Sequence, residues 1–221
     1  MTLCLDIHTH HPAPQPLAVV SVGIDDFNPI EGQFYSVGIH PWNTNGNVTA
    51  QEWEKLDRIA EMPCVVAIGE CGIDKLKGGP MFRQLLIWRH HIELSEKLRK
   101  PLIVHDVKAH DIIVGIKKDM NPTQPWVVHG LRAKPTVAKM LTDEGIYVSF
   151  GEKFNSETPR TVPEQLMLAE TDESELTIEQ IIFNLSQNLG KDIFTLIKEN
   201  TNRFLFGETE IDKGIVKDEM F

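Results

Sequence analysis

The sequence lacks the features that define secreted, membrane-spanning and disulfide-stabilised proteins. It has three cysteines among 221 residues, an odd and scattered set that does not look like a disulfide framework. No apolar run approaches the roughly 20 residues that cross a bilayer. No basic segment leads into an apolar stretch at the N-terminus, so we expect no secretory signal. These absences predict a cytoplasmic protein with reduced thiols and no membrane partner.

Positive charge is scarce as well. The formal net charge is −10, and no stripe rich in Lys or Arg is visible. An acidic surface repels nucleic acid unless a local site reverses the sign of the charge. If nucleic acid is a substrate, bound cations must supply much of the attraction. The hydrophobic fraction of 41% is that of an ordinary globular protein.

The chain also lacks internal repeats and linkers rich in Gly or Ser. We therefore expect one domain over residues 1–206, followed by an acidic tail over residues 207–221. Short apolar segments of strand length recur along this domain. They are residues 3–8, 17–24, 34–40, 64–70, 101–105, 125–130, 145–151 and 165–172.

Helical patterns occupy most of the later connections. They cover residues 49–62, 81–100, 109–120, 134–145 and 177–206, the last of which is broken near Gly190. Thr49 and Glu52 have the spacing of a capping box. The connection 9–16 is too rich in proline for a helix, and 25–33 is short and punctuated by turn residues. These elements predict an α/β fold, a (β/α)8 TIM-like barrel with some early helices shortened or missing. An open doubly wound sheet uses the same elements and is the alternative.

Titratable side chains stand at the ends of the predicted strands. The stretch "LDIHTHH" (5–11) places Asp6, His8 and His10 on one face if it is a strand. The later strands end on side chains of the same kind, namely His40, Glu70, His105, His129 and Asp172. In a barrel, the carboxyl ends of all strands meet at one rim, where active sites are built. We therefore expect these groups to converge.

Histidines and carboxylates without cysteine are suitable ligands for Zn²⁺, Mn²⁺ or Fe²⁺, and for Mg²⁺ if water completes the shell. We expect one or two divalent ions at the rim, with Glu70 as a bridge. The expected ligands are His8, His10, Glu70 and Asp172 for one ion, and Glu70, His105 and His129 for the other. Two ions about 3.5–4 Å apart clamp the attacking and leaving oxygens of a displacement. Asp172 would accept the proton of the attacking water, so Glu70 and Asp172 are the predicted catalytic residues.

Six short motifs follow one another along the chain. They are Asp6–His10 (DIHTH), Gly38–Pro41 (GIHP), Ile68–Asp74 (IGECGID), Ile103–His105 (IVH), Val128–Gly130 (VHG) and Glu170–Asp172 (ETD). In this order they resemble the TatD family of metal-dependent hydrolases, within the amidohydrolase superfamily, and so does the closing segment 198–205. The resemblance implies a barrel, a phosphoesterase site with one or two metals, and DNase activity. It also implies that His40 lies on the substrate side, near the scissile phosphate.

The sequence departs from the family pattern at the substrate wall. Where the family usually has an arginine two residues after the fifth-strand histidine, this chain has Val107. On an extended strand the neighbouring Lys108 would point the other way. The loop 173–180 lacks the proline and aromatic residues usual after the last motif, and the chain is shorter than usual for the family. These departures bear on DNA as the substrate more than on hydrolysis.

Several other polar residues have less specific patterns. Arg132 closely follows His129 and is a candidate phosphate-binding residue, with a solvated helix start as the alternative. Asp6 is expected to fix the tautomer of a ligand histidine, with a structural role as the alternative. We expect His90 and His91, on a predicted helix, to be solvated or packed.

Together, these patterns predict a divalent-metal-dependent hydrolase of the TatD type that cleaves phosphoester bonds by attack of metal-bound hydroxide. The candidate substrate is DNA. Two alternatives stay open. One is an amidohydrolase acting on a C–N or C–O bond of a small molecule, and the other is a metal-binding protein without catalysis.

Overall fold

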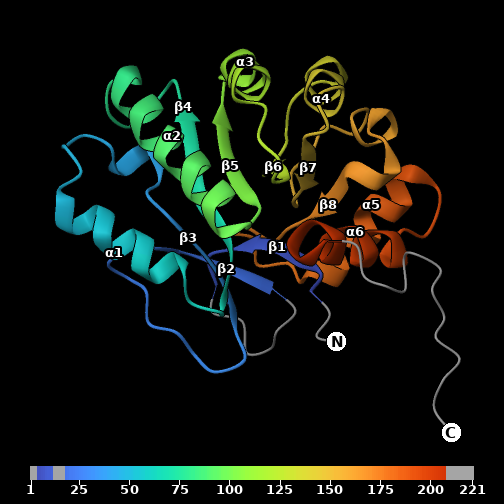
Figure 1. Ribbon diagram of the computed structural model, residues 1–221. Helices are drawn as coiled ribbons and strands as arrows, with labels where there is room; N and C mark the ends of the chain where they lie inside the picture. Colours follow the sequence, from blue (N-terminus) through green and yellow to red (C-terminus); the bar gives the residue numbers. More distant parts are fainter. Residues whose placement is uncertain (1–3, 12–17, 208–221) are drawn as a thin grey trace, which may run out of the picture.

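The computed structural model describes residues 4–11 and 18–207. Its eight strands are parallel and follow one another in chain order around a barrel (Figure 1). They are β1 (Asp6–Thr9), β2 (Ala18–Gly23), β3 (Phe34–Gly38), β4 (Val65–Asp74), β5 (Leu102–Val107), β6 (Trp126–Val128), β7 (Tyr147–Phe150) and β8 (Met167–Ala169). Each strand overlaps one of the predicted segments, but β4 and β5 extend beyond them, and β6 and β8 are shorter than predicted.

The ring of strands closes between β1 and the segment after β8. The backbone N–H of Asp172 donates to the carbonyl of His8 at 2.9 Å, and the N–H of His10 donates to the carbonyl of Asp172 at 3.1 Å. The predicted (β/α)8 barrel is therefore confirmed, and the open doubly wound sheet is wrong. The same bonds place His8, His10 and Asp172 side by side at the rim.

The described residues form six α-helices, which surround the strands (Figure 1). They are α1 (Ala50–Ala60), α2 (Met81–Leu98), α3 (His110–Met120), α4 (Pro135–Thr142), α5 (Ile178–Leu189) and α6 (Phe194–Phe206). No helix occurs between β2 and β3 among the described residues, as predicted. Most of the connection 9–16 and the tail from 208 onward lie outside the described residues. Between β7 and β8 the chain forms two short 3-10 turns, Pro159–Thr161 and Glu164–Leu166.

Local hydrogen bonds account for the helix ends. Thr49 Oγ1 accepts from the N–H of Glu52 at 3.2 Å, and the Glu52 carboxylate accepts from the N–H of Thr49 at 2.7 Å. This reciprocal pair is the predicted capping box at the start of α1. Gly190 has a φ of 73° and ends α5, which accounts for the predicted break in 177–206.

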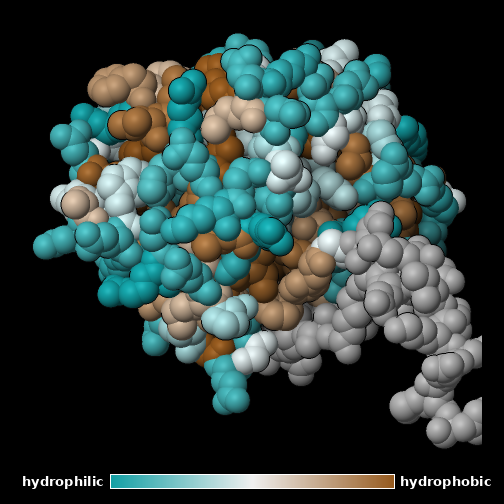
Figure 2. Space-filling view, in the orientation of Figure 1, coloured by the Kyte–Doolittle hydropathy of each residue, from teal (hydrophilic) through white to brown (hydrophobic). Residues whose placement is uncertain are grey.

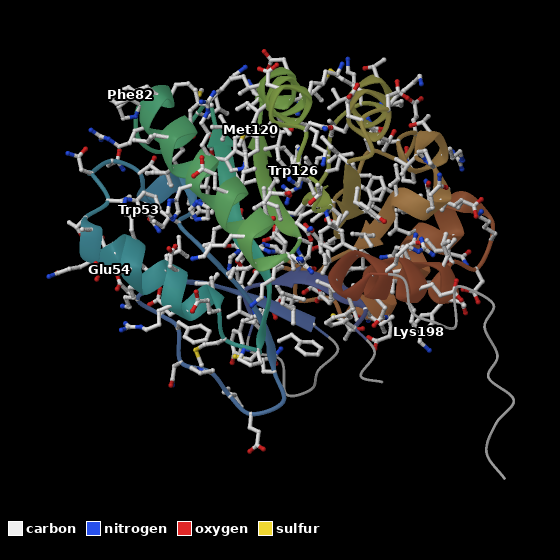
Figure 3. The ribbon with its side chains drawn as sticks, viewed as in Figure 1. Trp53, Glu54, Phe82, Met120, Trp126 and Lys198 are labelled. Carbon is white, nitrogen blue, oxygen red and sulfur yellow. The ribbon has the colours of Figure 1, made fainter. Side chains whose placement is uncertain are left out.

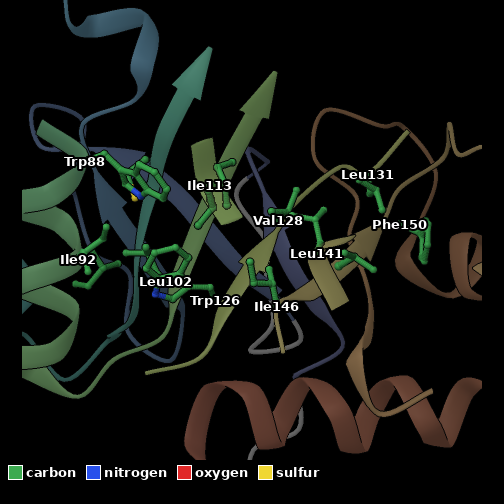
Figure 4. Close-up of a cluster of buried hydrophobic side chains, with 14 of the residues drawn as sticks. Trp88, Ile92, Leu102, Ile113, Trp126, Val128, Leu131, Leu141, Ile146 and Phe150 are labelled. Atoms are coloured by element: carbon green, nitrogen blue, oxygen red, sulfur yellow. The ribbon is translucent and has the colours of Figure 1, made fainter. Parts of the chain in front are cut away.

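The main hydrophobic core lies between the strands and the surrounding helices. In Figure 4, Trp88 and Ile92 of α2 face Leu102 of β5 and Trp126 of β6. A smaller cluster joins strand residues, among them Ile103, to residues of α6. Burial of these apolar side chains leaves the rim at the carboxyl ends of the strands as the place where polar groups gather.

Most of the face shown in Figure 2 is hydrophilic, with apolar side chains at its upper left. Phe82 and Leu86, one turn apart on α2, are exposed. Figure 3 shows Phe82 at the upper left and the exposed Glu54 of α1 at the outer edge. No α-helix of the described chain combines the length and apolar character needed to span a bilayer.

Candidate metal centre

Glu70 lies at the centre of the rim, with only 5% of its surface exposed. Two glycines allow β4 to carry it there. A Cβ atom on Gly38 would lie 2.7 Å from the carbonyl oxygen of Glu70, and one on Gly69 would lie 2.4 Å from the carbonyl oxygen of Ile103. Larger residues would push β3 and β5 away from β4, so glycine at both positions permits the close approach that aims Glu70 inward.

One oxygen of the Glu70 carboxylate faces three histidines. Its Oε1 lies 2.6 Å from Nδ1 of His105, 2.7 Å from Nε2 of His129 and 3.0 Å from Nε2 of His40. His129 and His40 follow β6 and β3 closely, whereas His105 lies inside β5, as Glu70 lies inside β4. The expectation that His105 and Glu70 end their strands is therefore wrong, because both strands continue beyond them. We call His105, His129 and His40, with this oxygen, the Oε1 side of the site.

The other oxygen faces a second group of donors. Oε2 lies 3.5 Å from Nε2 of His8 and 3.4 Å from Nε2 of His10. Oδ1 of Asp172 lies 3.7 Å from both of these nitrogens. We call His8, His10 and Asp172, with this oxygen, the Oε2 side. The structure thus brings all six predicted ligands together. The five ligands other than Glu70 are divided between the two oxygens of its carboxylate.

Two further carboxylates stand behind the histidines of the Oε1 side. Oδ2 of Asp74 lies 3.4 Å from Nε2 of His105, and Oε1 of Glu170 lies 3.4 Å from Nδ1 of His129. Asp74 also accepts from the indole N–H of Trp42 at 2.7 Å. Glu170 is fully buried and accepts from the hydroxyl of Ser149. Such outer carboxylates fix the ring orientation of a metal-binding histidine.

Sequence reasoning missed the role of Glu170 and Ser149. Glu170 belongs to the quoted motif Glu170–Asp172, but the strand-end rule singled out Asp172 alone. Residues two apart on an extended chain share a face, so Glu170 could have been assigned to the same side. Ser149 carries no comparable signal, because a serine inside an apolar strand has no pattern of its own.

The outer carboxylates favour tautomers of His105 and His129 whose electron pairs point at one oxygen of Glu70. If Asp74 holds the Nε2 proton of His105 and Glu170 holds the Nδ1 proton of His129, both remaining ring nitrogens are acceptors. These nitrogens lie within 2.7 Å of the same carboxylate oxygen. Acceptors so close to one another repel unless a cation or a proton lies among them. The Oε1 side is therefore suited to a divalent cation.

The charges of the side chains agree with this arrangement. Burial alone would raise the pKa of Glu70, but the charge of His129 and the contacts with His10 and His105 hold that pKa well below its usual range. Burial would lower the pKa of His129, whereas the charges of Glu70 and Glu170 raise it well above its usual range. Without a metal, a proton on His129 thus balances the buried carboxylates.

His8 gives a second, independent indication of a cation. Its side chain is fully buried, and within the described residues neither ring nitrogen has a hydrogen-bond partner. Burial, followed by the charge of His129, lowers the pKa of His8 to about 3, so the ring is neutral at ordinary pH. A buried nitrogen without a partner costs free energy, and an ion on the Oε2 side would use its electron pair.

His40 differs from the other histidines in the state of its ring. Its Nδ1 accepts a hydrogen bond from the backbone N–H of Trp42 at 3.1 Å. In a neutral ring the proton must then lie on Nε2, which faces Glu70 and Nδ1 of His105 at 3.3 Å. A nitrogen that carries a proton donates a hydrogen bond and cannot bind a metal. The ring of His40 is therefore arranged as a donor, although its Nε2 lies among the possible ligand atoms.

A cleft of about 970 Å³ opens above the site. Lys108 and Arg132 line it together with His40, and Trp42 stands at its edge with 42% of its surface exposed. The expectation that Lys108 points away is wrong. Lys108 has a φ of 56°, so the chain turns after β5 instead of continuing as an extended strand.

Asp6 has the structural role that was the alternative, and His90 and His91 are partly exposed and packed, respectively, as expected. The carboxylate of Asp6 does not fix a histidine ring but accepts from the backbone N–H of His8 and from the N–H and hydroxyl of Thr171. This ties β1 to the segment that carries Asp172. On α2, His90 pairs with Asp57, whereas His91 is fully buried and accepts from the backbone N–H of Ile39.

A parallel barrel with a cluster of histidines and carboxylates at the carboxyl rim defines a metal-site barrel protein. Comparison with known families supports a more specific assignment. The model of the family described as TatD related DNase matches residues 28–179. The chain therefore belongs to this family, as the motifs in the sequence indicated.

Similar proteins carry names of the same kind. A protein of Buchnera aphidicola subsp. Baizongia pistaciae named "Uncharacterized metal-dependent hydrolase" is 33% identical over 146 residues, covering 62% of this chain and 54% of that protein. The "3'-5' ssDNA/RNA exonuclease TatD" of Erwinia billingiae is 33% identical over 99 residues, covering 42% of this chain and 36% of that protein. The chain spans about half the length of the metal-dependent hydrolases it matches.

Solved structures confirm the fold. The TatD homologue YJJV of Escherichia coli K12 matches with a TM-score of 0.78 at 18% identity, over 91% of this chain and 97% of that chain. A TatD-family hydrolase of Entamoeba histolytica matches with a TM-score of 0.74 at 15% identity, over 94% and 99%. At these identities the matches speak for the barrel alone.

Proposed function

We propose that the chain binds two divalent cations on opposite sides of Glu70 and hydrolyses phosphoester bonds, with nucleic acid as the candidate substrate. The observation that carries the proposal is the division of the Glu70 carboxylate. One oxygen faces His105 and His129, and the other faces His8 and His10. A carboxylate shared in this way is the bridge that a pair of ions requires.

When bound, the ions would lower the pKa of a water molecule and neutralise charge on the phosphoryl group. Glu70 would fix the spacing of the pair. We propose that Asp172 accepts the proton of the water, because its carboxylate belongs to the Oε2 side and also lines the cleft. The outer carboxylates Asp74 and Glu170 would hold His105 and His129 in position.

The cleft wall offers groups for the substrate. The Trp42 N–H holds the ring of His40 in the tautomer with its proton on Nε2. This N–H now faces Oε1 of Glu70 at 3.0 Å, and it would donate to an oxygen of the phosphate once an ion takes up that oxygen. Lys108 follows His105 and Arg132 follows His129, and both line the cleft. We propose that Lys108 and Arg132 bind the negatively charged phosphates on either side of the scissile phosphate. The chain carries a net charge of −10, so these residues and the ions would supply the attraction for an anionic substrate.

The choice of a nucleic-acid substrate has one further support. The Erwinia billingiae relative is named for exonuclease action on single-stranded DNA and RNA, and it is similar over 42% of this chain. The acidic surface favours neither DNA nor RNA. We therefore propose a phosphodiester of a nucleic-acid strand as the substrate class. The assay below distinguishes DNA from RNA.

The test is nucleotide release from single- and double-stranded DNA and from RNA by metal-stripped protein reloaded with Mg²⁺, Mn²⁺ or Zn²⁺. Glu70→Gln removes the bridging charge, and Glu54→Gln is the matched control because Glu54 is exposed on α1 (Figure 3). We expect cleavage by wild type and Glu54→Gln and none by Glu70→Gln.

A parallel panel of amides, lactones and small phosphate esters separates the alternatives. Metal-dependent turnover of an amide or lactone, without release of nucleotides, would replace phosphoester hydrolysis by amidohydrolase chemistry. Binding of metal without turnover of any of these substrates would overturn the proposal in favour of a metal-binding protein without catalysis.

A further inference from the structure

His91 is a buried titratable residue outside the metal centre. It lies in α2 on the face that packs against the barrel, and none of its surface is exposed. Its Nδ1 donates to the carbonyl of Ile87 at 2.8 Å, and its Nε2 accepts from the backbone N–H of Ile39 at 2.9 Å. The two partners fix the tautomer, because a carbonyl can only accept and an N–H can only donate.

The bond to Ile39 lies where the ordinary sheet pairing stops. The paired residues of β3 and β4 end at Val37 and Ile68. Beyond them β4 carries Glu70 into the barrel. The N–H of Ile39 is therefore left to the ring of His91, which reaches it from α2. A buried N–H without an acceptor would be costly, so His91 holds this point of the backbone in place.

The next residue in the chain is His40. From the anchored Ile39, its ring reaches Oε1 of Glu70 at 3.0 Å, and its other nitrogen accepts from Trp42 N–H. His40 is thus held on both sides, by the backbone anchor before it and by the Trp42 N–H after it. A shift of the backbone at Ile39 would displace Nε2 of His40 from Glu70 and change how the ring lines the cleft.

We propose that His91 is a positioning residue, which aligns the Nε2–H of His40 for substrate by capping the N–H of Ile39. The inference rests on the proposed phosphoester hydrolysis, in which His40 contacts the phosphate. His91 itself touches neither substrate nor the predicted metal ligands. Its neighbour His90 is the natural control, because it pairs with Asp57 and makes no bond to β3.

The experiment compares His91→Leu, His91→Gln and His90→Gln in the full chain. Leucine removes the acceptor, whereas glutamine keeps an oxygen for Ile39 and an N–H for Ile87. We expect His91→Leu to lower kcat by about 10- to 100-fold, the range found for residues that position others at metal sites. We expect His91→Gln and His90→Gln to stay close to wild type. A binding titration with Mn²⁺ should give the same stoichiometry for all variants, because His40 is not a ligand.

A readout that needs no turnover is nitrogen NMR of histidine-labelled, metal-free protein. We expect the signals of His40 to shift in His91→Leu and to return in His91→Gln. If His91→Leu lowers only the melting temperature, while kcat and the His40 signals match wild type, His91 is structural and the proposal is overturned. If wild type itself cleaves no phosphoester, the proposed function fails, and unchanged His40 signals in His91→Leu would then also remove the positioning role.

Discussion

The two oxygens of Glu70 have different surroundings. On the Oε1 side, His105 and His129 approach within 2.7 Å, and each has a carboxylate behind it. On the Oε2 side, His8 and His10 lie 3.4–3.5 Å from the carboxylate, and the side chain of His10 is 39% exposed. The Oε1 side is thus held together by the chain itself, whereas the Oε2 side has fewer bonds of its own. This difference predicts that the two ions respond to different substitutions.

The largest effect is expected for Glu70→Gln, which removes the charge that both sides share. We expect loss of both ions and a fall in turnover of more than about a thousandfold, since each ion supplies several kcal/mol to the transition state. Isothermal titration with Mn²⁺ and the nucleotide-release assay measure the two effects. If Glu70→Gln still binds one ion tightly, the carboxylate is not the common ligand and the two sides are independent.

A smaller effect is expected for Glu170→Gln, which acts mainly on the Oε1 side, because Glu170 lies 3.4 Å from His129 and reaches His8 and Asp172 by charge alone. Without the carboxylate behind it, His129 loses the charge that orients its ring, and affinity for one ion should fall by about 10- to 100-fold. Affinity for the second ion should fall less, because the charge of Glu170 acts on His8 and Asp172 but its carboxylate is not paired with His10. Glu175→Gln, exposed after β8, is the control. Equal weakening of both ions in the titration would show that the two sides are not separable.

His91 predicts a dependence of stability on pH. Burial lowers the pKa of His91 to about 4 from 6.5, against the opposing effect of the hydrogen bond to the Ile87 carbonyl, with His90 and Asp57 nearby. Between pH 6.5 and pH 4, His91 is therefore protonated in the unfolded chain and neutral in the folded chain. The contribution of His91 to the free energy of unfolding is complete above pH 6.5. It is lost as the pH falls toward 4, at up to about 1.4 kcal/mol per pH unit.

His91→Gln cannot take up this proton. Urea unfolding between pH 7 and pH 4 should show a steeper loss of stability in wild type than in His91→Gln. Because the other acidic and basic groups are common to both proteins, their effects cancel in the difference. If the free energy of unfolding changed with pH in the same way in both proteins, His91 would have an ordinary pKa and would not be held neutral by its burial.

The smallest effect concerns the cleft wall next to the Oε1 side. Lys108 and Arg132 follow the histidines of this side and are exposed. Exposed ion pairs contribute up to about 1 kcal/mol, so Lys108→Ala and Arg132→Ala should each raise KM about fivefold at low salt, with kcat unchanged. The effect should shrink at high salt as screening grows. A fall in kcat at constant KM would instead assign these residues to the transition state.

Much of the fold could be predicted because its elements have strong local signals. The apolar strand segments are short and regular, and the Thr49 capping box and Gly190 mark helix ends that the structure confirms. The convergence of the ligands followed from the barrel rule that strand ends share a rim. Their roles as ligands remain predictions until an ion is observed.

Other features depend on contacts that the sequence does not show. The turn at Lys108 comes from a left-handed backbone, which an extended-strand pattern cannot anticipate. Asp6 bonds to Thr171, which lies far along the chain. His91 had a usable signal, because it shares the buried helix face of Gln84, Trp88 and Ser95 at helical spacing. That spacing indicates burial, but only the structure supplies its partner on Ile39.

The most direct test of the divided carboxylate is anomalous diffraction from crystals of the full chain soaked in Mn²⁺. The account predicts two manganese peaks about 3.5–4 Å apart, one bound by Oε1 of Glu70 with His105 and His129, the other by Oε2 with His8 and His10. It also predicts that His40 binds neither ion. A single peak, or one coordinated by Nε2 of His40, would contradict the account.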